Sequence, residues 1–209
     1  MYSAVELKEV KIKPKINDIT LDVLREYYEY FLYPSIYTYT IIRQGGQQEI
    51  ELRFDIENFC HLLGIESVAR QAIRQSDLYN YRGDKGWDNI KNGLVDIKHL
   101  KKLSKRQFSN VKAKYVYFYL IPELLDTPLG VKYDKAKVSI STKIECEILF
   151  YNEYNNVVIH LGLEKKTGAV YYIPRTFFVE KLGKNILADK YVENQERIIV
   201  AKKERIIML

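Results

Sequence analysis

His61 is the residue whose type and surroundings first suggest chemistry. It lies in the run Asn58 to Ile65, which has the spacing of a short helix directly after a strand-like run at 50–56. At about 100° per residue, His61 points away from the apolar side of that helix, and Gly64 ends the helix as a C-cap residue. The apolar positions are Ile56, Phe59, Leu62 and Leu63. Because imidazole exchanges protons near neutral pH, His61 is a candidate general acid or base.

Three cationic side chains and one hydroxyl occupy strand positions that core packing does not require. Arg53 and Lys143 lie in the polar phase of their predicted strands, and Arg175-Thr176 directly follows a strand. Cleavage of an RNA phosphodiester without a metal needs a base for the 2′-hydroxyl, positive charge at the phosphate and an acid for the leaving oxygen. We therefore expect one catalytic cleft at an end of the sheet, formed by His61, Arg53, Lys143, Arg175 and Thr176.

The candidate catalytic residues other than His61 also have plainer structural interpretations. Arg53 can simply pair with Glu51 on the same strand face. Lys143 can pair with neighbouring glutamates, and Thr176 can cap a following helix. His160 lies in the opposite phase from the apolar residues of its strand, so it is a second acid or base candidate, ranked below His61.

Positive charge is concentrated in one stretch of the chain. The net charge is +6, but residues 82–114 hold ten Lys or Arg and three Asp, which is 10 − 3 = +7. The rest of the chain is therefore near neutral, and a stretch of this kind favours contact with a phosphate backbone. The alternative is a solvated helix surface. The residues expected to bind nucleic acid are Arg82, Lys98, Lys101, Lys102 and Lys105.

The composition indicates a globular protein with a real core, since 47% of the 209 residues are hydrophobic. The 18 Tyr are expected mainly on sheet faces, with base stacking as the alternative. Cys60 and Cys146 have no metal-like spacing, so we expect reduced structural thiols, inside regular elements, in a cytoplasmic protein. No apolar run approaches the roughly 18 residues of a membrane span, and no motif indicates a metal or another cofactor.

Periodicity predicts helices in the first half of the chain, interrupted by one hairpin. A helix begins at Asp18 or Thr20 and ends at Pro34, and the segment 81–87 reads as a loop. Further helices are expected at 67–75 and 96–104, and then around the apolar stripe from Phe108 to Tyr119 that Pro122 kinks or ends. The hairpin joins strands at 36–43 and 50–56 through a turn at 44–47.

After Gly130 the hydrophobic period changes to two, which predicts strands. The expected strands are 144–150, 157–163, 169–173 ended by Pro174, and two tail pieces at 197–201 and 205–209, with Asn155-Asn156 as one turn. The fold class is therefore α+β, an antiparallel sheet with the helices segregated to one side. Residues 1–209 are expected to form a single domain, with a strand-rich C-terminal extension at about 190–209.

Six short blocks follow one another in a familiar order. They are Arg53-Phe54, Asn58 to Ile65, Ile90 to Gly93, Ser141 to Ile144, Leu161 to Leu163 and Tyr172 to Phe178. In this order they resemble the phage-associated branch of the barnase/EndoU/colicin/RelE-like nuclease superfamily, over a core of about 20–178. The resemblance places His61 in a His-Leu-x-Gly block, Lys143 in a Thr-Lys pair, and Arg175-Thr176 where a serine is more usual. Threonine at that position keeps a hydroxyl.

The resemblance implies a compact α+β fold and RNA cleavage without a metal, usually in mobile elements, conflict systems or toxins. The expected partners are RNA and, as a candidate, an antitoxin or immunity protein; no membrane and no cofactor are expected. The alternative is a non-catalytic factor on the same fold, an anti-defence protein or mobile-element regulator that binds nucleic acid or protein.

Overall fold

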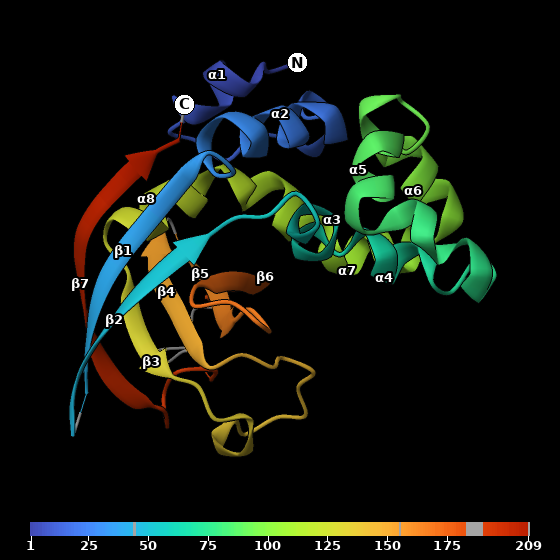
Figure 1. Ribbon diagram of the computed structural model, residues 1–209. Helices are drawn as coiled ribbons and strands as arrows, with labels where there is room; N and C mark the ends of the chain where they lie inside the picture. Colours follow the sequence, from blue (N-terminus) through green and yellow to red (C-terminus); the bar gives the residue numbers. More distant parts are fainter. Residues whose placement is uncertain (44, 155, 183–189, 209) are drawn as a thin grey trace. The chain divides into compact units, whose positions relative to one another are not determined.

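The structure is a computed structural model that describes residues 1–43, 45–154, 156–182 and 190–208. The chain divides into two compact units (Figure 1). We call Met1–Pro34 with Asp55–Tyr119 the helical unit, and Ser35–Phe54 with Leu120–Leu209 the barrel unit. The hairpin that the sequence predicts after Pro34 therefore belongs to the second unit, although the chain on both sides of it belongs to the first.

Eight α-helices occur among the described residues, seven of them in the helical unit. They are α1 (Ala4–Lys8), α2 (Leu21–Phe31), α3 (Asn58–Leu63), α4 (Ile65–Ala69), α5 (Gly83–Lys91), α6 (Ile97–Leu103), α7 (Lys105–Tyr117) and, in the barrel unit, α8 (Ile121–Asp126). Short 3₁₀ helices lie at Ile16–Asp18, Gln75–Tyr81, Phe118–Leu120 and Lys135–Lys137.

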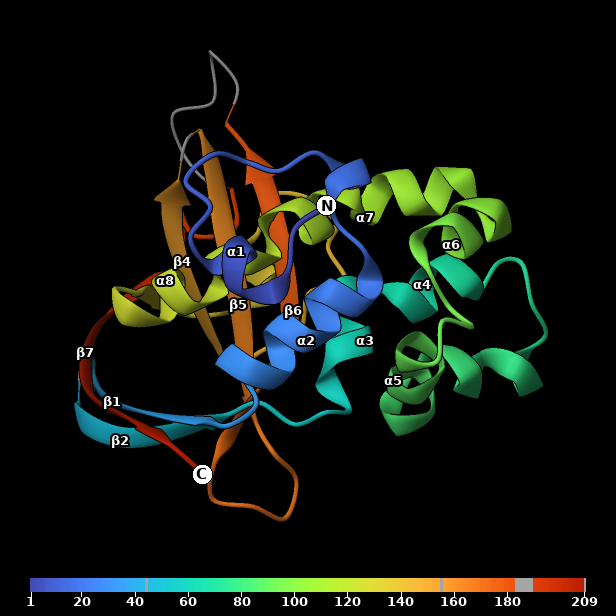
Figure 2. The same ribbon diagram turned by 90° about the horizontal axis from the view of Figure 1, so that it is seen from above.

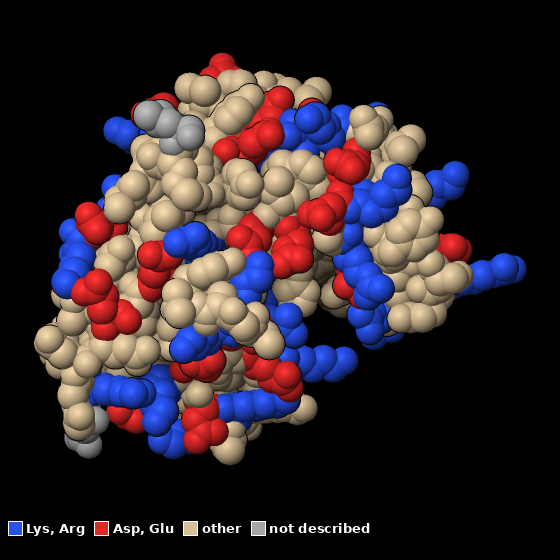
Figure 3. Space-filling model, in the orientation of Figure 1, with Lys and Arg blue, Asp and Glu red and all other residues tan. Residues whose placement is uncertain are grey.

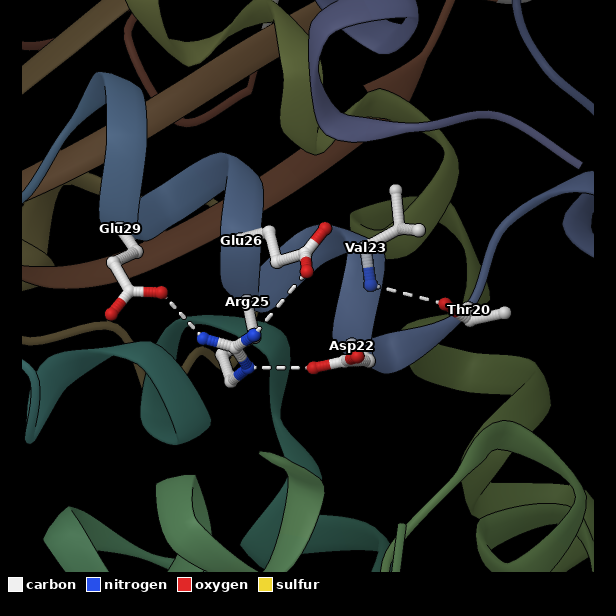
Figure 4. A network of polar contacts seen from close by, with 6 residues as sticks. All are labelled: Thr20, Asp22, Val23, Arg25, Glu26 and Glu29. Carbon is white, nitrogen blue, oxygen red and sulfur yellow. Dashed lines mark hydrogen bonds and ion pairs between the residues drawn. The ribbon is translucent and has the colours of Figure 1, made fainter. Parts of the chain in front are cut away.

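Helix α2 begins after Thr20, one of the two caps that its sequence predicts, and ends at Phe31, three residues before Pro34. The Thr20 hydroxyl accepts a hydrogen bond from the Val23 amide at 3.0 Å, and this satisfies one of the free donors of the first turn. Figure 4 shows the buried Arg25 of this helix between three carboxylates. Its guanidinium lies 2.6 Å from both Asp22 and Glu29. Burial alone would lower the pKa of Arg25, but these hydrogen bonds hold its pKa above the ordinary value.

An aromatic cluster joins α2, α3 and α5 in the helical unit. Tyr28 of α2 packs edge-on against Phe59 of α3 at 5.4 Å between ring centroids, and α2 and α3 lie side by side in Figure 2. Phe59 also contacts Trp87 at 5.2 Å and Phe118 at 6.0 Å. The Tyr28 hydroxyl donates to the Asp55 carbonyl at 2.6 Å, so the buried ring keeps a polar partner. Each such aromatic pair contributes about 0.5–1.5 kcal/mol beyond the burial of its surface.

Two helical predictions need correction, and one helix was not predicted. The helix expected at 67–75 is α4, which begins directly after Gly64 and ends at Ala69. In the segment 81–87, expected as a loop, Tyr81 ends a 3₁₀ helix and α5 begins at Gly83; Gly86 serves close packing inside this helix and not a turn. A Cβ at Gly86 would lie 2.8 Å from the Cys60 sulfur and 2.8 Å from the carbonyl carbon of Tyr81. A helix that the sequence analysis did not predict, α1, lies before residue 10 and has a capping box between Ser3 and Glu6.

Seven strands occur among the described residues of the barrel unit, together with α8. They are β1 (Ser35–Arg43), β2 (Gly46–Arg53), β3 (Leu129–Lys132), β4 (Ile148–Tyr154), β5 (Val157–Lys165), β6 (Tyr172–Lys181) and β7 (Glu196–Ile207). Their order is β1-β2-β6-β5-β4-β3-β7, and β7 pairs again with β1, so the sheet is a closed barrel. The turns predicted at 44–47 and at Asn155-Asn156 include Gln44 and Asn155, which lie outside the described ranges.

The α+β class and the mainly antiparallel pairing are confirmed, but the sheet closes into a barrel, which the sequence did not predict. The two tail pieces are one strand, β7, which pairs antiparallel with β1 from Ser35↔Ile207 to Ile42↔Ile199 and with β3 near Gly130↔Ile198. One further pair, β2 with β6, is parallel and closes the other side of the hairpin at Leu52↔Tyr172. The seven helices α1 to α7 form a unit of their own, while α8 belongs with the barrel.

Both faces of the barrel wall carry apolar side chains. Tyr39 of β1 packs against Phe150 of β4 at 5.1 Å, and its hydroxyl donates to the Leu125 carbonyl of α8 at 2.8 Å. A second cluster lies on the opposite face of β3 to β5, since its residues alternate with the first set along the strands. Its buried members are Val131, Tyr133, Val138, Leu149, Tyr151, Val158 and Val192.

The second cluster explains the late start of β4 and the burial of His160, both of which differ from the prediction. Residues 144–147 have the expected alternation of exposure, but β4 begins only at Ile148, so Cys146 lies outside a regular element. The apolar side chains Ile144 and Cys146 pack against the second cluster, which gives this non-strand segment a strand-like pattern. His160 belongs to the same face and is fully buried, stacked on Phe178 at 4.2 Å between ring centroids. We therefore assign it no role in proton transfer.

We expect that only glycine fits at position 130, because side chains of β7 lie close to this residue of β3. A Cβ at this position would lie 2.5 Å from Val200 Cγ2 and 2.9 Å from Ile198 Cγ1, both on β7. Gly130→Ala should therefore lower the free energy of unfolding by about 1–3 kcal/mol, as overpacking does. Urea denaturation measures this, and Leu129→Ala, at the exposed neighbouring position, is the control and should change it by less than about 0.5 kcal/mol. Equal effects of the two substitutions would contradict the packing argument.

Candidate functional site

His61 lies on α3 with its side chain exposed, as the sequence predicts. Phe59, Leu62 and Leu63 of the same helix are fully buried. Because Phe59 is held in the aromatic cluster and lies two residues before His61, the two side chains leave the helix in nearly opposite directions. The Asn58 side chain accepts from the Asp55 amide at 3.1 Å, which fixes the entry of the chain into the helix. The orientation of His61 is therefore a consequence of the burial of its neighbours.

Gly64 and Lys114 hold the end of the helix that carries His61. Gly64 adopts the left-handed conformation with φ of 70°, and its amide donates to the carbonyls of Cys60 and His61. A Cβ there would also lie 2.9 Å from Val111 Cγ1, so glycine is required by space as well as by conformation. The Lys114 ammonium of α7 donates to the Leu62 carbonyl at 3.1 Å. Burial lowers the pKa of Lys114 to about 8.

Arg175 and Thr176 lie inside strand β6, so the expectation that Pro174 ends a strand is wrong. The β5–β6 register passes from Gly162↔Thr176 to Leu163↔Pro174 and leaves Arg175 as the extra residue of a bulge. A proline beside a bulge removes no ladder hydrogen bond, which is why the strand continues through it. The Arg175 side chain is exposed and lies 3.5 Å from Glu164, and bulges commonly re-aim side chains at functional sites.

Thr176 and the segment that carries Lys143 approach the same point of β5. A Cβ at Gly162 would lie 2.6 Å from Thr176 Cγ2 and 2.9 Å from the Cys146 sulfur, so both side chains cover this glycine. Lys143 lies three residues before Cys146 in the same extended segment and is exposed. The structure thus brings Thr176 and this segment together through Gly162. Burial raises the pKa of the Cys146 thiol to about 12, so it is not a nucleophile near neutral pH.

Arg53 makes the contact that its plainer interpretation predicts. Its guanidinium pairs with Glu51 on the same face of β2. It also lies over the Tyr171 ring at 4.7 Å, directly before the start of β6. Arg53 is thus placed beside the strand that carries Arg175 and Thr176, with its charge partly balanced by Glu51.

The five residues expected to meet in one cleft come from both units. Arg53, Lys143, Arg175 and Thr176 belong to the barrel unit, and His61 belongs to the helical unit. The shared cleft therefore stays a prediction.

The residues expected to bind nucleic acid lie in the helical unit. Helix α6 has the predicted bounds, with Asp96 and Ser104 as its caps and Ile97 and Leu100 buried. Lys98, Lys101, Lys102 and Lys105 have helical spacing on the other side, and within the described ranges none of the four makes an ion pair. In Figure 3 Lys and Arg side chains project over α4 to α6.

The other two residues of interest in this unit have protein partners. Arg82 is exposed and lies 3.8 Å from Glu66. His99 Nε2 lies 2.8 Å from the Tyr81 hydroxyl, and the two rings are stacked at 5.9 Å. His99 is therefore held by Tyr81, whereas Arg82 keeps most of its surface in solvent.

With this geometry in place, comparison with known proteins is decisive for the family. Residues 21–207 match the model of the family described as phage-Barnase-EndoU-ColicinE5/D-RelE like nuclease 4, or PBECR4. The chain belongs to the PBECR4 family. The match extends through β7, well past the core of about 20–178 that the sequence resemblance covered, and it confirms that resemblance. No curated protein and no solved structure matches the chain.

The described part of this PBECR4 protein has neither a metal-binding group of side chains nor a helix that could span a membrane. Within 1–43, 45–154, 156–182 and 190–208, no three His, Cys, Asp or Glu side chains are grouped so that they could hold a metal ion. Within the same residues no helix is both long and apolar enough to cross a membrane.

Lys114 is the residue near the candidate site that sequence reasoning missed, because it was counted with the basic stretch. Its position gave a signal: it lies three residues after Val111 and next to Tyr115, within the apolar stripe of its helix. A lysine in that phase is expected to be partly buried and to need an acceptor. The Leu62 carbonyl, one residue after His61, is that acceptor.

We expect the burial of Lys114 to appear as a dependence of stability on pH. Its pKa is about 8 in the folded protein against an ordinary value of 10.5, so folding favours the neutral amine. Below pH 8 the cost of burying the ammonium is present in full, and it disappears as the pH rises from 8 to 10.5. The wild type should therefore become more stable relative to Lys114→Met over that interval.

Urea denaturation of both proteins from pH 7 to above about pH 10 measures this difference. The tyrosines titrate in both proteins, so their contribution cancels in the comparison. Lys112→Met, on the exposed side of the same helix, is the control and should show a difference that does not change with pH. A flat curve for Lys114→Met as well would contradict the assignment.

Proposed function

We propose that this PBECR4 family protein is an endoribonuclease that cleaves RNA without a metal ion. The 2′-hydroxyl attacks the adjacent phosphorus, the bond to the 5′-oxygen breaks, and the products are a 2′,3′-cyclic phosphate and a 5′-hydroxyl. One proton leaves the 2′-oxygen and one is delivered to the 5′-oxygen, so the reaction consumes no other reagent. A role in a mobile element or a toxin and conflict system, with an antitoxin or immunity protein as partner, is part of this proposal.

The proposed roles follow from the chemistry of each side chain. His61 transfers a proton as general base or general acid. Arg53, Lys143 and Arg175 balance the charge that develops on the phosphate, and the Thr176 hydroxyl donates a hydrogen bond to a phosphate oxygen. Arg175 is favoured among the cations because its bulge position re-aims its side chain; like Arg53 beside Glu51, it has a carboxylate neighbour, Glu164.

One observation carries the proposal. In a chain of a nuclease family, His61 is the exposed residue of a helix whose other face is fixed by a buried aromatic cluster and whose end is fixed by Gly64 and Lys114. Because an exposed imidazole contributes little packing, its position on a fixed helix favours a role in proton transfer over a role in stabilising the fold.

Incubation of the purified protein with total RNA in EDTA tests the reaction. We expect cleavage with a 2′,3′-cyclic phosphate at the new ends, identified by mass spectrometry. His61→Ala should reduce the rate by at least about 100-fold, the usual contribution of a general acid or base. Its free energy of unfolding should change by less than about 0.5 kcal/mol, since the side chain is exposed.

Ser67→Ala, at an exposed position of the next helix, is the control and should cleave like the wild type. Unchanged cleavage by His61→Ala would remove His61 from the mechanism. A wild type that binds RNA and leaves it intact would favour the alternative, a non-catalytic factor that binds nucleic acid or protein.

The lysines of α6 and the start of α7 are expected to supply much of the affinity for RNA. Replacing Lys98, Lys101, Lys102 and Lys105 together by Gln should weaken binding and flatten its salt dependence. Each lost phosphate contact lowers the slope of log K against log salt by about 0.7 for single strands, so all four would lower it by about 3. Fluorescence anisotropy with a labelled oligonucleotide at several salt concentrations measures the slope.

A second variant separates this surface from net charge alone. It carries the same number of Lys→Gln changes at exposed positions of the same unit, which are Lys8, Lys11, Lys13 and Lys15. If both variants change the slope equally, the α6 surface has no special role in RNA binding.

A further inference from the structure

A pocket of about 280 Å³ opens in the barrel unit, separate from any residue assigned so far. Ile41 of β1, Ile148 of β4 and Ile198 of β7 are buried and form its apolar part. The strands that supply them are not all neighbours in the sheet, so the pocket exists because the sheet is closed. Its volume is at the lower end for small-molecule sites, which suits one small ligand with an apolar body.

Two cations line the pocket without an anionic partner. Arg43 comes from the end of β1 and Lys132 from the end of β3, and both are exposed. Among the described residues neither takes part in an ion pair, whereas Lys202 and Lys203 of the same unit are paired with Asp126 and Glu49. These two cations against the one carboxylate of Glu147 leave the charged lining of the pocket at 2 − 1 = +1, which favours an anion, and a phosphate accepts hydrogen bonds from both cations.

The pocket also contains an oriented acceptor. Glu147 Oε1 accepts from the Lys165 amide at 3.2 Å, and Oε2 accepts from the Tyr172 hydroxyl at 3.2 Å. A carboxylate offers about four acceptor positions and no donor, so two positions remain for a ligand that carries N–H groups. Gln48 lines the same pocket and adds an amide that can donate or accept.

These groups together describe a ligand with three parts. It carries an anion for Arg43 and Lys132, a flat or apolar body that suits the isoleucines and the rings of Tyr133 and Tyr172, and an N–H donor for Glu147. A nucleotide has all three, since its phosphate is the anion, its base stacks on aromatic rings, and an exocyclic amino group donates to a carboxylate.

The pocket also adjoins the part of β6 assigned to phosphate binding. Cys146 lines the pocket, and its sulfur lies 2.9 Å from the point that a Gly162 Cβ would occupy. Thr176 Cγ2 lies 2.6 Å from that same point. A nucleotide in the pocket would therefore be a near neighbour of the phosphate that Thr176 is proposed to bind.

We infer that this pocket binds one nucleotide whose base carries an exocyclic amino group, with the phosphate on Arg43 and Lys132 and the amino group on Glu147. The inference deepens the proposed ribonuclease function, because the RNA chain would supply the nucleotide; a free nucleotide is the other source of the same chemistry. It predicts that adenine and cytosine are preferred to uracil at one position of the substrate.

Isothermal titration of the full chain with two matched pairs of nucleotides tests the inference directly. AMP and IMP differ at position 6, which is amino or oxo, and at N1, which carries a hydrogen only in IMP; CMP and UMP differ in the same way at position 4 and at N3. AMP and CMP should bind about tenfold more tightly than IMP and UMP, the usual discrimination of a well-formed base contact. Equal affinities within each pair, or no binding at millimolar concentration, would overturn the inference.

Two variants assign the contacts. Glu147→Gln keeps the shape of the side chain but replaces an acceptor by a donor, so the preference should shift toward IMP and UMP. Arg43→Gln with Lys132→Gln should weaken AMP about tenfold and leave adenosine, which has no phosphate, nearly unchanged. Lys137→Gln, an exposed lysine of the same unit outside the pocket, is the control.

Thermal denaturation checks that each variant is folded. If a variant does not fold, the comparison of AMP with IMP and of CMP with UMP on the wild type still tests the inference. If the double variant binds adenosine more weakly by the same factor as AMP, the assignment of Arg43 and Lys132 to the phosphate is wrong.

Parallel cleavage assays separate this inference from the proposed reaction. If the protein cleaves RNA but binds both members of each nucleotide pair equally, the proposed ribonuclease activity is supported and nucleotide binding in the pocket is contradicted. Discrimination that depends on Glu147 in a protein that leaves RNA intact would sustain the pocket and overturn the ribonuclease. Competition between AMP and an oligoadenylate for the wild type identifies RNA as the source of the nucleotide, and simultaneous binding of both identifies the free nucleotide.

Discussion

The barrel depends on the pairing of β7 with two strands at once. This strand hydrogen-bonds to β1 along one side and to β3 along the other, and so it joins the first hairpin of the unit to the strands that follow α8. Without it, both β1 and β3 would present unpaired backbone groups, an arrangement that invites association with other chains. The apolar part of the pocket depends on the same closure, since Ile41 lies on β1 and Ile198 lies on β7.

In the helical unit the corresponding constraint is the burial of Phe59. Contacts of this ring with Tyr28, Trp87 and Phe118 fix the rotation of α3 about its axis, and that rotation places His61 in solvent. Gly64 and Lys114 then fix the end of the helix from two directions, one through its own conformation and the other from α7. The candidate acid or base thus owes its position to residues that need not touch a substrate.

Local features were predictable from the sequence, and features that depend on distant pairing were not. The helix of His61, the cap at Thr20 and the basic helix between Asp96 and Ser104 follow from patterns within ten or fifteen residues, and the structure has all three. Closure by β7 and the bulge at Arg175 depend on partners elsewhere in the chain, so Pro174 looked like a strand end. Similarly, Gly86 looked like part of a loop because nothing near it in the sequence reveals the Cys60 sulfur against which it packs.

The interleaving of the two units has a consequence for biosynthesis. Because Ser35 pairs with Ile207, β1 leaves the ribosome long before its partner does, whereas every residue of the helical unit has been made once Tyr119 is added. At about 5–20 residues per second the 207 − 53 = 154 residues between the end of the hairpin and the end of β7 take roughly 8 to 30 seconds. During that interval the newly made β1 edge is open to any extended peptide nearby, so the nascent chain is most exposed to mispairing before translation ends.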